Sequence, residues 1–154
     1  MTTPALIIET VTDPAPCFAL REEVFMAEQG FTAEEEWDDL DAGAEHLLAT
    51  LDGVPVGTAR LLEDPDAGRI GRICVRRPAR GTGLGAALVR AGIDRLAARG
   101  ITRIVLGAQV RAMGFYEGLG FAACGPEYDD GGVPHREMEL WLVPGQGGLA
   151  PSGA

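Results

Sequence analysis

The sequence predicts a mixed α/β fold with a central sheet of about seven strands and about four helices. Strand-like and helix-like segments follow one another as strand, two helices, three strands, helix, strand, helix and two strands. An Asp52-Gly53 pair separates two apolar runs, which is a strong β-hairpin signal. A glycine-rich turn at residues 80–86 joins another strand-like run to a long helix-like run. These features together favour a sheet covered by helices.

The first 40 residues predict one strand and two helices. Residues 6–10 have the β-branched character of a strand, and a helix is expected from two prolines near residue 15 to Gly30. Thr32 and Glu35 resemble a capping box that opens an acidic second helix reaching about Leu40. We expect its three consecutive glutamates to form a solvated face. The expected buried face of the first helix consists of Phe18, Leu20, Val24 and Phe25.

Three strands and a long helix follow. Residues 46–51 and 54–62 form the predicted hairpin, and a second turn leads to a strand at residues 69–75. Residues 84–99 have apolar side chains near helical spacing, and Gly100 is expected to end this helix.

The C-terminal part predicts two more strands around a short helix. Residues 101–106 form a mostly apolar strand, as expected where both faces are covered, and a helix is expected at about residues 111–119. Residues 121–125 continue as a strand, and residues 126–134 read as an acidic, glycine-rich loop. Alternating polar and apolar residues predict a final strand at residues 136–143.

Composition restricts the class of protein. The 154 residues suffice for one domain, expected at residues 1–143, with residues 144–154 as a flexible tail. A net charge of −10 argues against nucleic acid or an anionic membrane as a partner. Residues 1–13 hold no basic residue, so no signal peptide is expected. Three widely spaced cysteines then favour reduced thiols in the cytoplasm, and no Cys/His spacing predicts a metal site.

The glycine-rich turn Arg80-Gly81-Thr82-Gly83-Leu84-Gly85-Ala86 predicts a site for a phosphate or pyrophosphate. Such a turn leaves backbone N–H groups unpaired at the positive end of a helix dipole. Its glycines permit a ligand to approach closely, and the arginine adds a forked, charged donor. A basic patch that suits an anionic cofactor surrounds the turn and consists of Arg69, Arg72, Arg76, Arg77 and Arg80.

Two common phosphate-binding motifs fit this turn less well. A Walker loop requires a lysine, and the chain contains none. The dinucleotide fingerprint matches at Gly81, Gly83 and Ala86, but it also requires an acidic residue at the end of the next strand. That strand ends without a carboxylate, so a dinucleotide-dependent oxidoreductase is the less favoured alternative.

Two segments together resemble the GNAT superfamily of acyl-CoA-dependent N-acyltransferases. Residues 80–85 are similar to its pyrophosphate-binding motif, Arg-x-x-Gly-x-Gly. The segment Gly114-Phe115-Tyr116-Glu117-Gly118-Leu119-Gly120-Phe121 is similar to its Phe-Tyr-x-x-x-Gly-Phe segment. The resemblance covers about residues 5–143 and extends to a small bacterial subgroup. It implies the GNAT fold, in which the fourth and fifth strands splay apart.

The resemblance also implies acetyl-CoA as the cosubstrate, with its pantetheine arm between the splayed strands. Backbone N–H groups of the fourth strand would polarise the thioester carbonyl. Because these enzymes use direct attack, we expect Cys74 to be a buried apolar residue and not a nucleophile. The cofactor-binding residues that the resemblance implies are Ile73, Cys74, Val75, Arg80, Gly81, Thr82, Gly83, Leu84, Gly85, Ala86, Gln109, Phe115 and Tyr116.

Acyl transfer also needs proton transfers to and from the reacting groups. Tyr116 matches the tyrosine with which the family often protonates the leaving thiolate, and packing against the pantetheine arm is its alternative role. The strand before the turn lacks the family's glutamate, so the base stays open among Glu28, Asp38, His46 and His135, or an ordered water. The last of these histidines is a candidate base or substrate contact.

We therefore expect a cytoplasmic N-acetyltransferase that moves an acetyl group from acetyl-CoA to a primary amine by direct attack. The alternative from another class is a non-catalytic acyl-CoA-binding sensor that lacks the base. A small molecule or a peptide fits as the acceptor, with an amino sugar, a polyamine, an antibiotic and a protein N-terminus all open. The resemblance also allows a homodimer, since many relatives pair.

Overall fold

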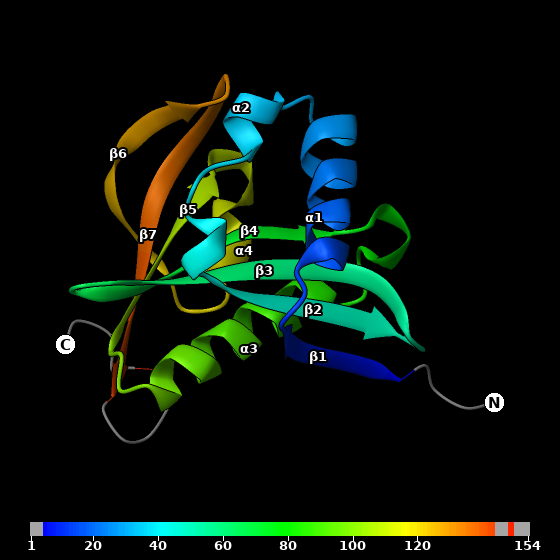
Figure 1. The fold of residues 1–154 in the computed structure, drawn as a ribbon. Helices are drawn as coiled ribbons and strands as arrows, with labels where there is room; N and C mark the ends of the chain where they lie inside the picture. Colours follow the sequence, from blue (N-terminus) through cyan, green and yellow to red (C-terminus); the bar gives the residue numbers. More distant parts are fainter. Residues whose placement is uncertain (1–4, 144–147, 150–154) are drawn as a thin grey trace.

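A mixed sheet of seven strands lies at the centre of the fold, in the order β1-β2-β3-β4-β5-β7-β6 (Figure 1). The computed structural model describes residues 5–143 and 148–149. The strands are β1 (Leu6–Val11), β2 (Glu45–Leu51), β3 (Val54–Asp64), β4 (Ala67–Val75), β5 (Arg103–Gln109), β6 (Ala122–Asp130), β7 (Val133–Val143) and β8 (Gly148–Leu149), which pairs with β7. The predicted fold class is confirmed. The predicted tail lies outside the described residues, apart from β8.

Helices connect the strands and cover both faces of the sheet. They are α1 (Ala15–Arg21) with its π-helical continuation η1 (Glu22–Glu28), α2 (Ala33–Glu36), α3 (Leu84–Ala98) and α4 (Met113–Glu117), with short 3-10 turns η2 (Asp41–Gly43), η3 (Arg77–Ala79) and η4 (Val110–Ala112). Within the described residues, no helix combines the length and apolar character that crossing a membrane requires.

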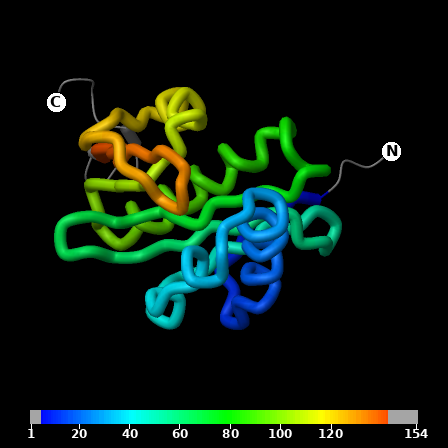
Figure 2. Tube along the Cα trace, turned by 90° about the horizontal axis from the view of Figure 1, so that it is seen from above, coloured from blue at the N-terminus to red at the C-terminus, as the bar shows by residue number. Residues whose placement is uncertain are grey.

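Two hydrophobic clusters lie on opposite faces of the sheet. The larger joins α3 to the sheet through residues such as Leu88, Leu96 and Ile70, and the smaller joins α1 through Leu20 and Val24. Figure 1 shows α1 and α3 on the two sides of β2–β4, and Figure 2 shows the same layers from above. Burial of apolar side chains on both faces fixes the sheet between its helices.

The predicted hairpin is confirmed at Asp52 and Gly53. Both residues have positive φ, 49° and 82°, as a two-residue type I′ turn requires. The predicted capping box is also present, since the Thr32 side chain accepts from the Glu35 N–H and the Glu35 carboxylate accepts from the Thr32 N–H.

The second helix is shorter than predicted, because it ends at Glu36 and not near Leu40. Trp37 has extended backbone angles, φ −89° and ψ 131°. This bend turns Glu36 inward, where its carboxylate lies 2.7 Å from Nε of Arg21 and its side chain is buried. The expectation that all three glutamates form a solvated face is therefore wrong for Glu36.

The predicted loop at residues 126–134 is also wrong, because β6 and β7 form a tight hairpin there. Gly131 and Gly132 make its two-residue turn with positive φ of 62° and 83°. Proline and acidic residues are depleted in strands, so the composition of β6 beyond Gly125 does not indicate a strand. The register between β6 and β7 shifts between Ala123 and Glu127, around the proline.

The fourth and fifth strands part after a very short parallel contact, as predicted. β4 pairs with β5 only at Gly68 with Ile104 and at Arg69 with Val105. Just beyond this contact, β4 carries a bulge against β3 in which Arg72 adopts φ of 48°. The bulge bends the strand away from β5 and leaves the β4 edge beyond Arg69 without a strand partner.

Candidate active site

A cleft of about 320 Å³ opens where β4 and β5 separate. Its walls come from β4, β5, the β6–β7 hairpin, α4 and the segment from η1 to α2. Of the predicted site residues, Ile73, Gln109, Tyr116 and His135 line this cleft together. They come from four separate elements, so the fold brings together residues that lie far apart in sequence.

The edge of β4 supplies backbone polar groups to the cleft. Ile70, Gly71 and Ile73 line it where β5 no longer pairs with β4. Unpaired strand edges bind extended ligands by main-chain hydrogen bonds. Cys74 faces the α1 cluster instead, and its burial raises the pKa of the thiol to about 12. A thiol with such a pKa stays protonated at neutral pH. The expectation that Cys74 is a buried residue is confirmed.

The glycine-rich turn presents free N–H groups, as predicted. In the described part of the chain, no carbonyl or side chain accepts a hydrogen bond from the N–H groups of residues 81–86. Gly83 is the N-cap of α3, has φ of 84° and carries no side chain that would cap these donors. The turn also approaches α4, since a Cβ on Gly85 would lie 3.5 Å from the Phe115 ring. The two motif segments therefore meet in space.

The basic patch around the turn is neutralised within the chain. Arg80 donates from Nε to the Val75 carbonyl at 2.9 Å, and its Nη2 lies 2.8 Å from Glu28 Oε2. Arg77 lies 3.7 Å from the same oxygen. The hydrogen bond from Arg80 lowers the pKa of Glu28. Glu28 thus lies beside the turn and outside the residues that line the cleft.

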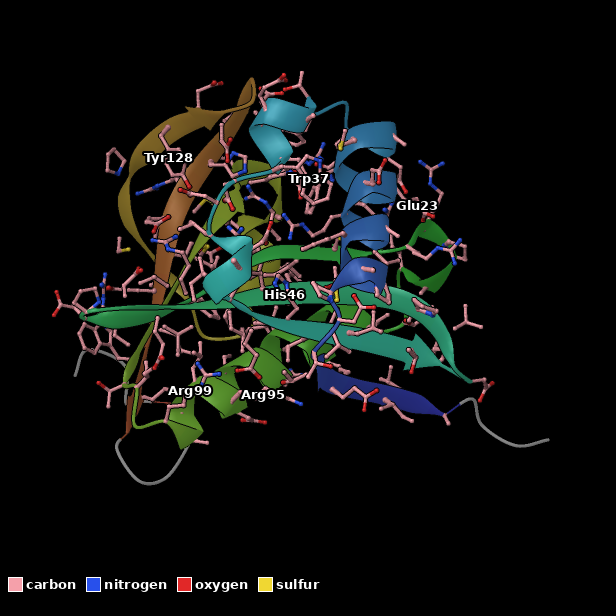
Figure 3. All side chains as sticks on the ribbon, in the orientation of Figure 1. Glu23, Trp37, His46, Arg95, Arg99 and Tyr128 are labelled. Carbon is pink, nitrogen blue, oxygen red and sulfur yellow. The ribbon has the colours of Figure 1, made fainter. Side chains whose placement is uncertain are left out.

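The other arginines of the patch also have acidic partners. Arg76 pairs with Glu23, which Figure 3 labels on the first helix. The remaining pairs are Arg69 with Glu137 and Asp64, and Arg72 with Glu36 and Asp38. An anionic ligand at the turn therefore interacts with backbone donors and the helix dipole more than with a free basic patch.

Tyr116 lies half-buried in the cleft between two other aromatic rings. Its ring centroid is 5.0 Å from that of Phe115 and 6.2 Å from that of Phe121. Burial raises the pKa of the Tyr116 phenol to about 12. The hydroxyl therefore keeps its proton at neutral pH, which is the state that a general acid needs.

His135 lies in the same cleft with one ring nitrogen fixed. Its side chain is only 7% exposed, and Nδ1 lies 2.8 Å from the carbonyl oxygen of Val133. Because a carbonyl only accepts hydrogen bonds, Nδ1 carries the hydrogen and Nε2 of the neutral ring holds a lone pair. The ring stacks on Tyr128 at 5.7 Å, a residue that Figure 3 labels on β6. Nε2 has no hydrogen-bond partner among the described residues.

The other two candidate bases have structural partners away from the reacting face. His46 is buried, and its Nε2 lies 2.9 Å from the Asp41 carbonyl oxygen. Asp38 pairs with Arg60 at 2.8 Å and with Arg72 at 3.4 Å. Neither His46 nor Asp38 lines the cleft.

Gln109 connects the end of β5 to the end of η1. Its Nε2 donates to Oε1 of Gln29 at 2.9 Å, and its own Oε1 accepts from Nε of Arg111 at 2.9 Å. Both glutamines line the cleft, so they hold its two walls at this point.

An ion cluster with a buried centre supports the cleft and was not predicted. It consists of three arginines and three carboxylates: Arg21, Arg60, Arg72, Glu36, Asp38 and Asp41. Trp37, labelled in Figure 3, lies over Arg21 with the guanidinium 4.9 Å from its ring centroid. The cluster joins α1 and the α2 segment to β3 and β4. Its carboxylates belong to a run of acidic residues, so no sequence spacing distinguishes them from solvated ones.

A family model and known proteins match most of the chain. Residues 18–142 match the family model described as an acetyltransferase (GNAT) domain. A proposed acetyltransferase of Bacillus subtilis (strain 168) is 36% identical over 134 residues, which cover 85% of this chain and 91% of that protein.

Two solved structures extend the comparison. A proposed N-acetyltransferase of Lactobacillus plantarum has a TM-score of 0.85 and 32% identity, covering 90% of this chain and 99% of the other. An acyl-CoA N-acyltransferase of Pseudomonas aeruginosa has a TM-score of 0.77 and 28% identity, covering 89% and 99%. Sequence and fold thus agree, and the chain belongs to the GNAT acetyltransferase superfamily.

Proposed function

We propose that this chain transfers an acetyl group from acetyl-CoA to a primary amine by direct attack. Membership of the GNAT superfamily supports N-acetyltransferase activity in general. The observation that carries the specific proposal is the cleft between β4 and β5, into which both Tyr116 and His135 face. Free N–H groups at the start of α3 lie on the segment that continues from β4.

Two parts of acetyl-CoA, its pyrophosphate and its pantetheine arm, have matching groups in this arrangement. Its pyrophosphate would accept hydrogen bonds from the N–H groups of residues 81–86, where the α3 dipole favours an anion. Its pantetheine arm would pair with the unpaired edge of β4 beyond Arg69. Phe115, which contacts the turn, and Gln109, at the end of β5, would flank the arm.

The residues in the cleft have complementary roles in the transfer. Nε2 of His135 takes a proton from the acceptor ammonium, and the neutral amine attacks the thioester carbonyl carbon. Backbone N–H groups near Ile73 stabilise the oxyanion. The C–S bond then breaks as the Tyr116 phenol gives its proton to the leaving sulfur. The attacking nitrogen loses its second proton as the amide forms, and this proton restores the phenol, while His135 releases its proton to solvent. The products are the acetylated amine and CoA with a free thiol.

Thiol release from acetyl-CoA over a panel of primary amines tests this proposal. We expect release that depends on the acceptor, with the acetylated amine detected by mass spectrometry. Acetyl-CoA binding without acceptor-dependent release would instead favour the sensor. Binding of a nicotinamide dinucleotide, and none of CoA, would favour the oxidoreductase. Homodimer formation and a cytoplasmic location stay predictions from the sequence and its family resemblance.

A further inference from the structure

Two carboxylates at the mouth of the cleft lack a cationic partner among the described residues. Glu35 belongs to α2 and Asp130 to the end of β6, and both line the cleft. The hairpin turn after Asp130 lies against α2, because a Cβ on Gly131 would meet the Phe31 ring and lie 3.1 Å from Oε2 of Glu35. Figure 1 shows the tip of the β6–β7 hairpin beside α2.

The charges of the arginines that line the cleft are, in contrast, already paired with carboxylates. Arg60 pairs through Nη1 with Asp38 at 2.8 Å and also with Asp41, while its Nε is buried without a hydrogen-bond partner among the described residues. Arg72 donates to the Glu36 carbonyl at 3.0 Å. The third lining arginine, at position 69, has its own carboxylate partners on β3 and β7. The carboxylates at the mouth of the cleft therefore lack cationic partners, whereas the arginines along its wall are paired with acidic side chains.

The inner end of the cleft holds an unpartnered basic nitrogen, Nε2 of the buried His135. His135 pairs with Tyr128 in the β6–β7 register, and Asp130 follows two residues later on the same face of β6. The backbone positions of residues in such a diagonal relation lie about 7–8 Å apart. A linear diamine of about five carbons therefore matches the scale of this separation.

We propose that the acceptor is a linear diamine, which rests on the proposed acetyl transfer. Its reacting amine meets Nε2 of His135, and its second ammonium lies between Glu35 and Asp130, beside the Phe31 ring. Two carboxylates and an aromatic face stabilise a cation at the mouth. A carboxylate at the far end of the acceptor would meet like charge there, since the lining guanidinium groups already have partners.

A series of acceptors of equal length tests the inference. The series is 1,5-diaminopentane, pentylamine and 5-aminopentanoate, whose far ends are cationic, neutral and anionic. We expect kcat/KM for the diamine to exceed that for pentylamine by about tenfold, a factor that corresponds to ~1.4 kcal/mol. The anionic member is expected to be the poorest acceptor. Diamines of three and seven carbons test whether the preferred acceptor has the five-carbon length that the β6–β7 register indicates.

Variants at the mouth test whether the preference for the diamine comes from Glu35 and Asp130 or from the overall acidic charge of the protein. In Glu35→Gln combined with Asp130→Asn, we expect the preference for the diamine over pentylamine to fall close to one. Glutamine keeps the capping box intact, so α2 is retained. Glu34→Gln is the matched control, because Glu34 is exposed on the same helix and lies outside the cleft lining. It should leave the preference unchanged.

Calorimetric titration with acetyl-CoA, run in parallel, separates failure of the diamine inference from failure of the proposed function. If acetyl-CoA binds but the three acceptors react equally, or if 5-aminopentanoate is preferred, the diamine inference is overturned and the proposed acetyl transfer stands. If acetyl-CoA binds and no amine of any length reacts, both the inference and the proposed transfer are overturned in favour of the sensor. If acetyl-CoA does not bind to the folded protein, the proposed function is overturned together with the inference.

Discussion

At the scale of single residues, one side chain in the cleft, Tyr116, can donate a proton, and another, His135, can accept one. The phenol of Tyr116 is surrounded by aromatic carbon, and burial raises its pKa to about 12. His135 presents a lone pair on Nε2, because Val133 holds the hydrogen of Nδ1. Donor and acceptor functions thus follow from the surroundings of each group.

Replacing Tyr116 by phenylalanine should lower kcat about 100-fold, the usual contribution of a general acid. Affinity for acetyl-CoA should change little, since the ring and its two aromatic contacts are retained. Steady-state kinetics with calorimetric binding measure both quantities. Unchanged turnover would remove the acid role and leave Tyr116 as a packing residue.

His135→Asn should also lower kcat by about 100-fold, while acetyl-CoA still binds. The asparagine amide can donate to the Val133 carbonyl as Nδ1 does, but it offers no basic nitrogen. His46→Asn is the matched control, because His46 is buried and bonded outside the cleft. Equal turnover losses in the two variants, each corrected for folded protein, would argue against His135 as the base.

Asp38 and Asp41 make stability depend on acid pH. Burial raises the pKa of each carboxyl, but hydrogen bonds and charges of their arginine partners outweigh burial and hold each pKa below its ordinary value. The unfolded chain therefore takes up protons first as pH falls. The stabilisation is fully present above about pH 4 and is lost as pH falls through the lowered folded-state values.

Urea unfolding at a series of pH values measures this effect. We expect the free energy of unfolding to decline more steeply below about pH 4 in the native chain than in Asp41→Asn, which lacks one of these carboxyls. Asp39→Asn, at an exposed position with no described ion pair, should retain the native acid dependence. An identical acid dependence in all three proteins would contradict the role of Asp41.

At the scale of elements, the sequence correctly predicted those features that neighbouring residues determine. The Thr32–Glu35 capping box, the Asp52-Gly53 turn and the long helix before Gly100 are all present. The end of α2 was missed, because it is set by a buried ion pair that Glu36 makes with a distant residue. The second half of β6, beyond Gly125, was missed because its pairing with β7 overrides a composition that is poor for strands.

The start of α3 provides a prediction at the same scale. Gly83→Ala should destabilise the fold by about 1 kcal/mol, because alanine is strained in the left-handed conformation that this position adopts. It should weaken acetyl-CoA binding more than this strain alone explains, since the turn aims the free N–H groups. Gly43→Ala is the control, with ordinary φ and open space around the added methyl group. Thermal unfolding and calorimetry compare the two variants.

At the scale of the whole molecule, the sheet consists of two parts joined by the brief β4–β5 contact. Strands β1–β4 pack between α1 and α3, and β5, β7 and β6 form the second part beside them (Figure 1). No periodicity in the sequence encodes this separation, because strand pairing depends on residues far apart along the chain. The splay was expected from the family resemblance, whereas the ion cluster and the acidic mouth emerged only from the three-dimensional arrangement.

Every role proposed for the cleft requires that the start of α3 and the free edge of β4 hold acetyl-CoA. Calorimetric titration of the purified chain with acetyl-CoA tests this most directly. We predict a saturable heat from one site per chain, displaced by CoA and unaffected by NAD. A flat trace at millimolar acetyl-CoA, from protein shown to be folded by circular dichroism, would contradict the account.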